Sequence, residues 1–111
     1  MPNQKIILKG MGASNGIAKG SVRIITNKKN FSLFKEGNVL VAKITDPSYV
    51  VLISRSAAVV TDIGSLMSHP AIVSREMGVP CVVATKKATT ILKNGQKIKV
   101  NGTKGIIYEA K

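Results

Sequence analysis

The single histidine of the chain, His69, follows Ser68 at the start of a stretch that is typical of a helix. The backbone N–H groups of a first helical turn have no partner within the helix, and the helix dipole is positive at that end. Such a place disfavours the imidazolium form, keeps the ring nucleophilic and attracts an anion to the free N–H groups. The position fits reversible phosphoryl transfer through a phosphohistidine, and equally an ordinary capping or surface residue.

Other kinds of catalytic or metal site have little support in the sequence. Ser68, His69 and Asp62 could form a Ser-His-Asp triad on paper, but neighbouring Ser and His side chains diverge at a helix start and no nucleophile elbow surrounds them. The GxxxxGK[ST] phosphate loop is absent. One histidine and one cysteine exclude a protein-made zinc site, so no metal is expected. Cys81 is expected to be a core residue of a chain kept in a reducing compartment.

The net charge of +12, from 17 Lys and Arg against 5 Asp and Glu, leaves three kinds of partner open. It suits nucleic acid, an acidic protein or a phosphorylated substrate. The lysines are spread along the chain and aromatic residues make up 4% of it, so a stacking platform for bases is missing. This argues against nucleic acid and for a field that assists docking. No signal peptide and no run of about 18 apolar residues is present, which predicts a cytoplasmic chain without membrane contact.

The hydrophobic pattern predicts the elements that position His69. It indicates one domain, residues 1–111, of the α/β class with a mixed sheet and few helices. Apolar, β-branched runs predict strands within 21–26, 38–44, 57–62 and 81–85, and a hairpin over 95–110. Helices are expected within 45–56 and over 69–77, and a polar loop over 28–37.

Capping residues bound the two predicted helices. Asp46 caps the first, and Pro47 suits its first position. Ser68 is expected to cap the second with its hydroxyl, and Gly78 to end it. Met67 and Met77 are expected to be packing residues.

Residues 61–85, TDIGSLMSHPAIVSREMGVPCVVAT, resemble the phosphohistidine motif of the phosphoenolpyruvate-utilising enzyme family. That family includes phosphoenolpyruvate synthase, pyruvate phosphate dikinase and enzyme I of the sugar phosphotransferase system. Its pattern is roughly T-x-x-G-G-x-x-S-H-x-A-I-x-A-R-x-x-G-x-P. The positions that match are Thr61, Gly64, Ser68, His69, Ala71, Ile72, Arg75, Gly78 and Pro80. Ser65 stands where the pattern has its second glycine, and Pro70, directly after the histidine, narrows the backbone freedom at the phosphate site. Segments on both sides also look like the family's domain.

The resemblance implies a swivelling β/β/α phosphohistidine domain in which His69 is the nucleophile and phosphoryl carrier. Thr45, from the turn before the first helix, is the candidate that orients the ring, with Ser48 as the second choice. Arg75 is a candidate that supports the site from behind the residues around the phosphate, with a structural ion pair as the alternative. The residues expected to shape the phosphate-facing loop are Ser68, Thr61, Gly64 and Ser65.

The resemblance also implies partners, because 111 residues hold the carrier alone. A nucleotide-binding, ATP-grasp-like subunit, a phosphoenolpyruvate- or pyruvate-binding subunit, or both, would then be separate polypeptides. ATP or phosphoenolpyruvate, with Mg²⁺, is expected on those partners, and no cofactor on this chain. The chain is then a phosphotransferase component that is inactive alone. The alternatives are a non-catalytic regulatory or binding module that keeps the fold, and a basic nucleic-acid binder.

Overall fold

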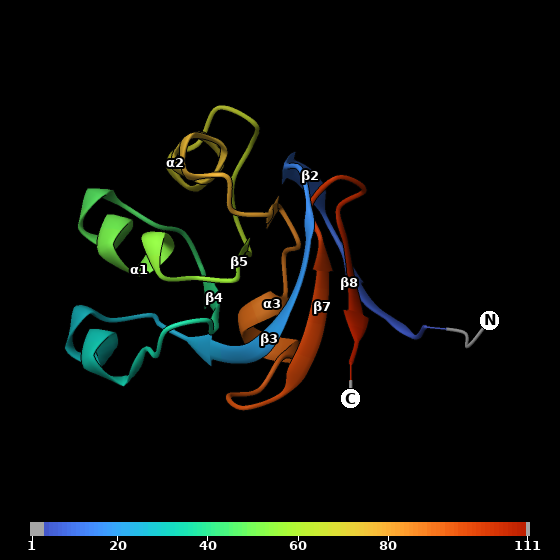
Figure 1. Ribbon diagram of the computed structural model, residues 1–111, viewed down its shortest axis with the longest axis horizontal. Helices are drawn as coiled ribbons and strands as arrows, with labels where there is room; N and C mark the ends of the chain where they lie inside the picture. Colours follow the sequence, from blue (N-terminus) through green and yellow to red (C-terminus); the bar gives the residue numbers. More distant parts are fainter. Residues whose placement is uncertain (1–3, 111) are drawn as a thin grey trace.

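The computed structural model describes residues 4–110, whose strands form one mixed sheet in the order β1-β8-β7-β3-β4-β5-β6-β2 (Figure 1). The strands are β1 (Ile6–Lys9), β2 (Met11–Ser14), β3 (Ile17–Ile24), β4 (Val39–Ala42), β5 (Ala58–Thr61), β6 (Cys81–Val83), β7 (Lys97–Asn101) and β8 (Ile106–Glu109). The helical segments are η1 (Lys28–Leu33), η2 (Pro47–Tyr49), α1 (Val50–Ser54), α2 (His69–Met77) and α3 (Ala88–Ile91). The predicted class, an α/β domain with a mixed sheet and few helices, is confirmed.

The centre of the sheet is parallel and buried on both faces. Strands β3, β4, β5 and β6 run parallel, and β2, β7, β8 and β1 pair antiparallel around them. Successive strand residues point to opposite faces, so Leu40 and Val59 lie in the core under α1 and α2, whereas Val41 and Val60 lie in the core with α3 and the β7–β8 hairpin. Figure 1 shows α1 and α2 on one side of these strands and α3 with β7 on the other.

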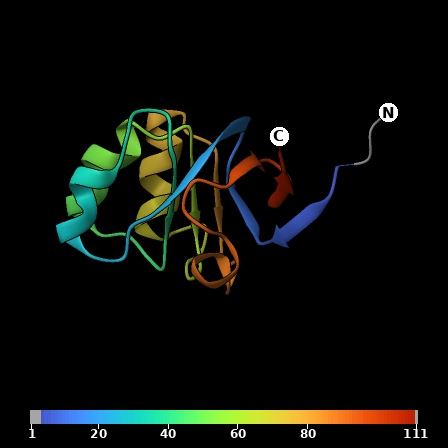
Figure 2. The ribbon, with the colours of Figure 1, turned by 90° about the horizontal axis from the view of Figure 1, so that it is seen from below.

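Four glycines, Gly10, Gly12, Gly102 and Gly105, let the two ends of the sheet meet; we call them the glycine seam. Strands β1 and β2 follow one another in the chain but lie at opposite ends of the strand order, so the chain at Gly10 bridges these ends. There the N–H of Gly10 donates to the carbonyl of Gly105 over 2.8 Å. A Cβ at Gly12 would lie 2.5 Å from the carbonyl oxygen of Gly102, so no side chain fits. In Figure 2, β1 extends away from the helices on the far side of this bridge.

Most predicted elements are present, and the differences have local causes. The strand expected over 21–26 is β3, which begins at Ile17 because Ile17–Ser21 pair with β7 before β4 is reached. The loop expected over 28–37 contains η1, whose N-cap Asn27 accepts from the N–H of Lys29. Strands β1 and β2 and helix α3 were not expected. Each has only four residues, and none contains an apolar run like those of β4 and β5.

Candidate functional site

The imidazole of His69 lies at the N-terminus of α2 and is held by Thr45. The hydroxyl of Thr45 is 2.8 Å from Nδ1 of His69. Thr45 is buried, with 5% of its surface exposed, so the hydroxyl that meets the ring has a fixed place. Nε2 makes no hydrogen bond to any of residues 4–110. The contact needed for Thr45 to orient the ring is therefore present, and it leaves Nε2 as the nitrogen open to a reactant.

The turn that carries Thr45 is built by Asp46. The Asp46 carboxylate accepts from the N–H of Ser48 over 2.8 Å and caps η2, as expected from the sequence. The Ser48 hydroxyl, followed by its N–H, holds the pKa of the Asp46 carboxyl below its ordinary value. Because the Ser48 hydroxyl is engaged with Asp46, it is not placed on the ring, and Thr45 alone of the two candidates contacts His69.

Residues 62–68, which we call the histidine loop, are held mainly by their own polar groups. The hydroxyl of Ser68 donates to the carbonyl of Ser65 over 2.7 Å and accepts from the N–H of Ser65. Ser68 occupies the N-cap position of α2 but makes no side-chain capping bond, so the expectation that its hydroxyl caps the helix was wrong. The hydroxyl turns back into the loop instead, which leaves the first-turn N–H groups uncapped by it.

Two further motif residues set the path of the histidine loop. The hydroxyl of Thr61 donates to the carbonyl of Ile63 over 2.8 Å, so it bends the chain after β5. Gly64 has φ +150, and a Cβ there would lie 3.0 Å from the Ser68 hydroxyl and 3.1 Å from Val83. Only glycine combines this conformation with this close approach to β6. Both residues act through the backbone of the loop.

Arg75 joins the histidine loop to the edge of the sheet. Its guanidinium donates to the carbonyl of Ala13 in β2 over 2.9 Å and to the carbonyl of Leu66 over 2.6 Å. The alternative of a structural ion pair was wrong: within residues 4–110 the ion pair found is Arg55 with Glu36. A guanidinium has donors in a rigid fork, so it can bridge two carbonyls that the sequence gives no reason to bring together.

Met67 and Met77, expected to be packing residues, are exposed. Met67 has 77% of its surface exposed and Met77 has 40%. Ile63 and Leu66, in the same loop, are also exposed. The prediction placed both methionines in the core because they are hydrophobic and lie close to a predicted helix. The core under α2 is filled by other residues, such as Ala71, Val79 and Cys81. The sequence signal that could have indicated this is the position of the apolar residues in a loop around polar, glycine-containing positions.

Cys81 is buried, as expected. Burial raises the pKa of its thiol to about 11, because the thiolate would be poorly solvated there. A thiol with so little thiolate is a poor nucleophile.

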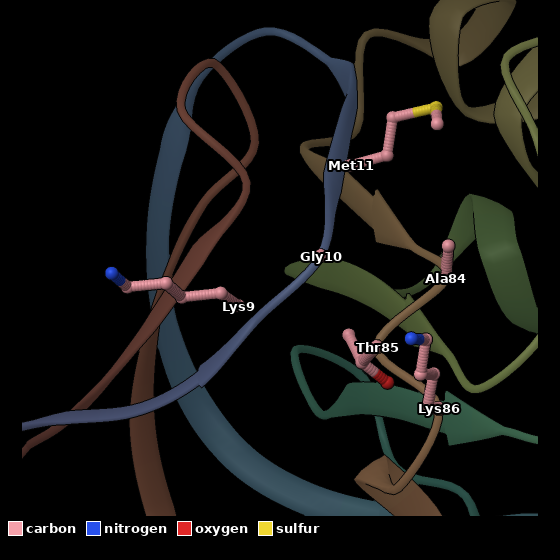
Figure 3. Close-up of a pocket in the computed structure, with 6 residues that line it drawn as sticks. All are labelled: Lys9, Gly10, Met11, Ala84, Thr85 and Lys86. Carbon is pink, nitrogen blue, oxygen red and sulfur yellow. The ribbon is translucent and has the colours of Figure 1, made fainter.

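A cavity of about 470 Å³ lies between the β1–β2 bridge and the segment after β6 (Figure 3). Ala84 and Lys86 there have φ +59 and +72, which is unusual for residues other than glycine. Figure 3 shows the Lys9 side chain pointing away from the Ala84–Lys86 segment. The two lysines therefore do not converge on an anion, and His69 does not line this cavity.

Residues 4–110 contain no group of three or more His, Cys, Asp or Glu side chains that could hold a metal ion. In the same range, no helix is long and apolar enough to cross a membrane.

The chain is similar to known proteins along most of its length. The family model "PEP-utilising enzyme, mobile domain" matches residues 34–105. The chain is 52% identical over 107 residues to a probable phosphoenolpyruvate synthase of Archaeoglobus fulgidus, and 50% identical over 105 residues to the phosphoenolpyruvate synthase of Pyrococcus furiosus. These matches cover 96% and 95% of this chain but only 14% and 13% of those proteins. The chain thus spans about one-seventh of the length of these relatives.

Solved structures show the same fold in two different settings. A solution structure of an Enzyme I protein is 31% identical with a TM-score of 0.58, over 66% of this chain and 30% of that one. The holo-form crystal structure of Thermococcus kodakaraensis aconitase X has a TM-score of 0.68 at 15% identity, over 94% of this chain and 98% of that one. The second likeness shows the fold alone, so function must be argued from the site.

Proposed function

The chain belongs to the family of PEP-utilising enzyme mobile domains, as its motif predicts, and from this premise we propose that it is a phosphoryl carrier whose carrying atom is Nε2 of His69. The observation that supports this most directly is the 2.8 Å contact between the Thr45 hydroxyl and Nδ1 at the N-terminus of α2. It gives the ring one held nitrogen and one open nitrogen.

The chemistry follows from that arrangement. With the ring proton on Nδ1 and donated to the Thr45 hydroxyl, the lone pair of Nε2 is available for attack. A bond forms between Nε2 and phosphorus while the donor's P–O bond breaks and its electron pair stays on the leaving oxygen. The transferred group would lie beside the first turn of α2, where Pro70 has no N–H and the donors that the Ser68 hydroxyl leaves uncapped are the N–H groups of His69 and Ala71. These donors and the helix dipole stabilise the phosphate's negative charge.

The carrier is proposed to work with modules that this chain does not contain. Relatives that match almost the whole chain are about seven times longer, so other parts of such proteins, or separate subunits, would bind the donor and the acceptor. ATP or phosphoenolpyruvate, each with Mg²⁺, is proposed as the donor held there. The chain alone is then expected to show no turnover of ATP and pyruvate.

A chemical donor tests the carrier without a partner. Phosphoramidate phosphorylates accessible imidazoles, so incubation with it should label His69 once per chain, with a product labile in acid and stable in alkali. NMR of the labelled ring should place the phosphate on Nε2. His69→Ala should abolish this label and lower the free energy of unfolding by only about 1 kcal/mol, because the half-buried ring contributes little packing and the Thr45 hydroxyl loses one hydrogen bond.

Thr45→Val is the matched variant for the orienting role. It keeps the shape of the side chain and removes the hydroxyl, so the label should divide between Nδ1 and Nε2.

An acid-stable ester on Ser65 or Ser68, or an unlabelled His69, would contradict the carrier. An unlabelled chain would favour the non-catalytic module instead.

A further inference from the structure

Four exposed apolar side chains lie in the two segments that meet at the His69 site: Ile44, Ile63, Leu66 and Met67, which we call the apolar collar. We propose that the collar is the surface that docks into an acid-rimmed, apolar-walled cleft of the module that donates the phosphoryl group. This inference rests on the proposed function, because it names the partner surface that the carrier needs.

The collar residues are brought around His69 by contacts within the site. Ile44 directly precedes Thr45, whose hydroxyl bonds to the ring. The N–H of Ile63 donates to the carbonyl of Lys43 over 3.0 Å, which places Ile63 beside Ile44's segment. Leu66 and Met67 form the turn that leads into Ser68 and α2. The collar is therefore assembled from two segments that meet at one site.

Each collar side chain has about half or more of its surface exposed. Ile44 and Ile63 each have 49% of their surface exposed, Leu66 has 46% and Met67 has 77%. Single exposed apolar residues are ordinary, but several gathered on one surface mark a contact site. Within residues 4–110 neither hydrophobic core includes any of these four side chains. The histidine loop is held by hydroxyl and guanidinium bonds, so the collar is not needed to hold it.

The charges beside the collar indicate the nature of the partner. Lys43 and Lys86 are exposed next to it, and the N–H of Lys86 donates to the carbonyl of Asp62. The nearby carboxylates are engaged locally: Asp46 with Ser48, and Asp62 with Thr89. These bonds come from neutral groups, so both carboxylates keep their charge and offset the two lysines; the excess of positive charge is that of the whole chain, which carries +12. A partner cleft with acidic residues at its rim is complementary to this excess.

The occupant we infer is the donor module of a phosphoenolpyruvate synthase. The chain accounts for about one-seventh of such relatives, so most of each relative lies outside the matched region. An apolar cleft that closes over the collar would also exclude water from the reacting bond.

The test supplies the donor module in trans. The probe is the full-length phosphoenolpyruvate synthase of Pyrococcus furiosus, with alanine at the position aligned with His69, together with phosphoenolpyruvate and Mg²⁺. The rate at which His69 acquires phosphate is measured against the concentration of the chain. Leu66→Ser/Met67→Ser should raise the half-saturating concentration at least tenfold and leave the maximal rate within twofold.

Ile17→Ser is the matched control. Ile17 has 60% of its surface exposed, like the collar residues, but lies on β3 five residues before the first that pairs with β4. It should leave the half-saturating concentration unchanged. Phosphoramidate labelling should be equal in all three proteins, because it needs no docking. Higher salt should raise the half-saturating concentration of the unmodified chain.

Each other outcome overturns a separate claim. Equal half-saturating concentrations for the collar variant and the parent chain would overturn the docking surface, and so would a collar variant that loses phosphoramidate labelling. A synthase that does not phosphorylate the unmodified chain, while phosphoramidate labels His69, would overturn this donor module as the occupant but leave the carrier. Absence of phosphoramidate labelling in the parent would instead overturn the proposed function.

Discussion

The glycine seam and the histidine loop are built by opposite means. In the seam, backbone meets backbone without side chains: a Cβ at Gly102 would lie 2.8 Å from the N of Cys81 and closer still to the carbonyl of Ser14. In the histidine loop, exposed residues are held by side-chain bonds, from Ser68 within the loop and from Arg75 outside it.

The difference indicates that the glycine seam supports the fold, whereas the histidine loop belongs to the proposed site. Buried close contacts cannot relax when a group is added, so changes in the seam should unfold the chain. Exposed loops open at little cost, so removing a side-chain bond that holds the histidine loop should alter reactivity and local protection from hydrogen exchange more than global stability. Variants in the two regions test that contrast.

Gly102→Ala should have the largest effect. The added methyl group meets backbone atoms of Ser14, Pro80 and Cys81, which cannot move without separating strands, and should cost at least about 3 kcal/mol of the free energy of unfolding. The measurement is urea denaturation. Gly37→Ala is the control: its Cβ meets nothing within 4 Å, and only its φ of +83 is unfavourable, for about 1 kcal/mol. Equal losses in the two variants would contradict the rigidity of the seam.

Cys81 meets Gly102 of the seam through its backbone N, and its thiol, which is buried in the core under α2, should make stability fall in alkali. Its pKa is raised from 9.0 to about 11 by burial. Between these values the unfolded chain loses the thiol proton and the folded chain keeps it, so the free energy of unfolding falls as pH rises above 9. The loss should reach about 2 kcal/mol by pH 10.5. Comparison with Cys81→Ala at pH 8 and 10.5, under reducing conditions, isolates this contribution; parallel pH profiles would refute it.

Arg75→Gln should loosen the histidine loop more than the fold. It removes the bridge between Leu66 and Ala13 and should cost about 1 kcal/mol of global stability. Hydrogen exchange at the N–H groups of Ser65 and Ser68 should accelerate by more than that loss explains, and phosphoramidate labelling should slow. Arg55→Gln is the matched control, since it removes an exposed ion pair that contributes about 0.5 kcal/mol or less. If the Ser65 and Ser68 N–H groups exchange at the same rate in both variants, Arg75 does not position the loop.

Ser68→Ala should have the smallest effect on stability. Its bonds lie within the histidine loop rather than across the first turn of α2, so the free energy of unfolding should change by about 0.5 kcal/mol or less. Loss of a capping serine would instead cost about 1 kcal/mol. Urea denaturation distinguishes these two values, with Ser54→Ala as the control because it loses one exposed bond to Val51. Hydrogen exchange at the Ser65 N–H should nevertheless accelerate.

The elements that the sequence predicted well are those with a strong local pattern. The apolar runs of β4, β5 and β6, the hairpin, and α2 with Gly78 at its end in the left-handed conformation were all expected. Strands β1 and β2 were missed because their pairing partners, β8 and β6, are remote in the chain. The Ser68 prediction failed for a different reason: its hydroxyl bonds to Ser65 within the histidine loop rather than across the first turn of α2.

From the sequence alone we could predict the α/β class, the family, and the place of His69 at a helix start beside a loop rich in hydroxyl groups. These features depend on local patterns and motif spacing. The roles of His69, of Thr45 and of the loop residues stay predictions that the experiments above test. Only the tertiary structure decided that Thr45 bonds to Nδ1, that Ser48 does not reach the ring, and that Arg75 ties the loop to β2. These contacts join residues 24 and 62 positions apart. Their geometry depends on how the sheet and helices pack, which no local pattern contains.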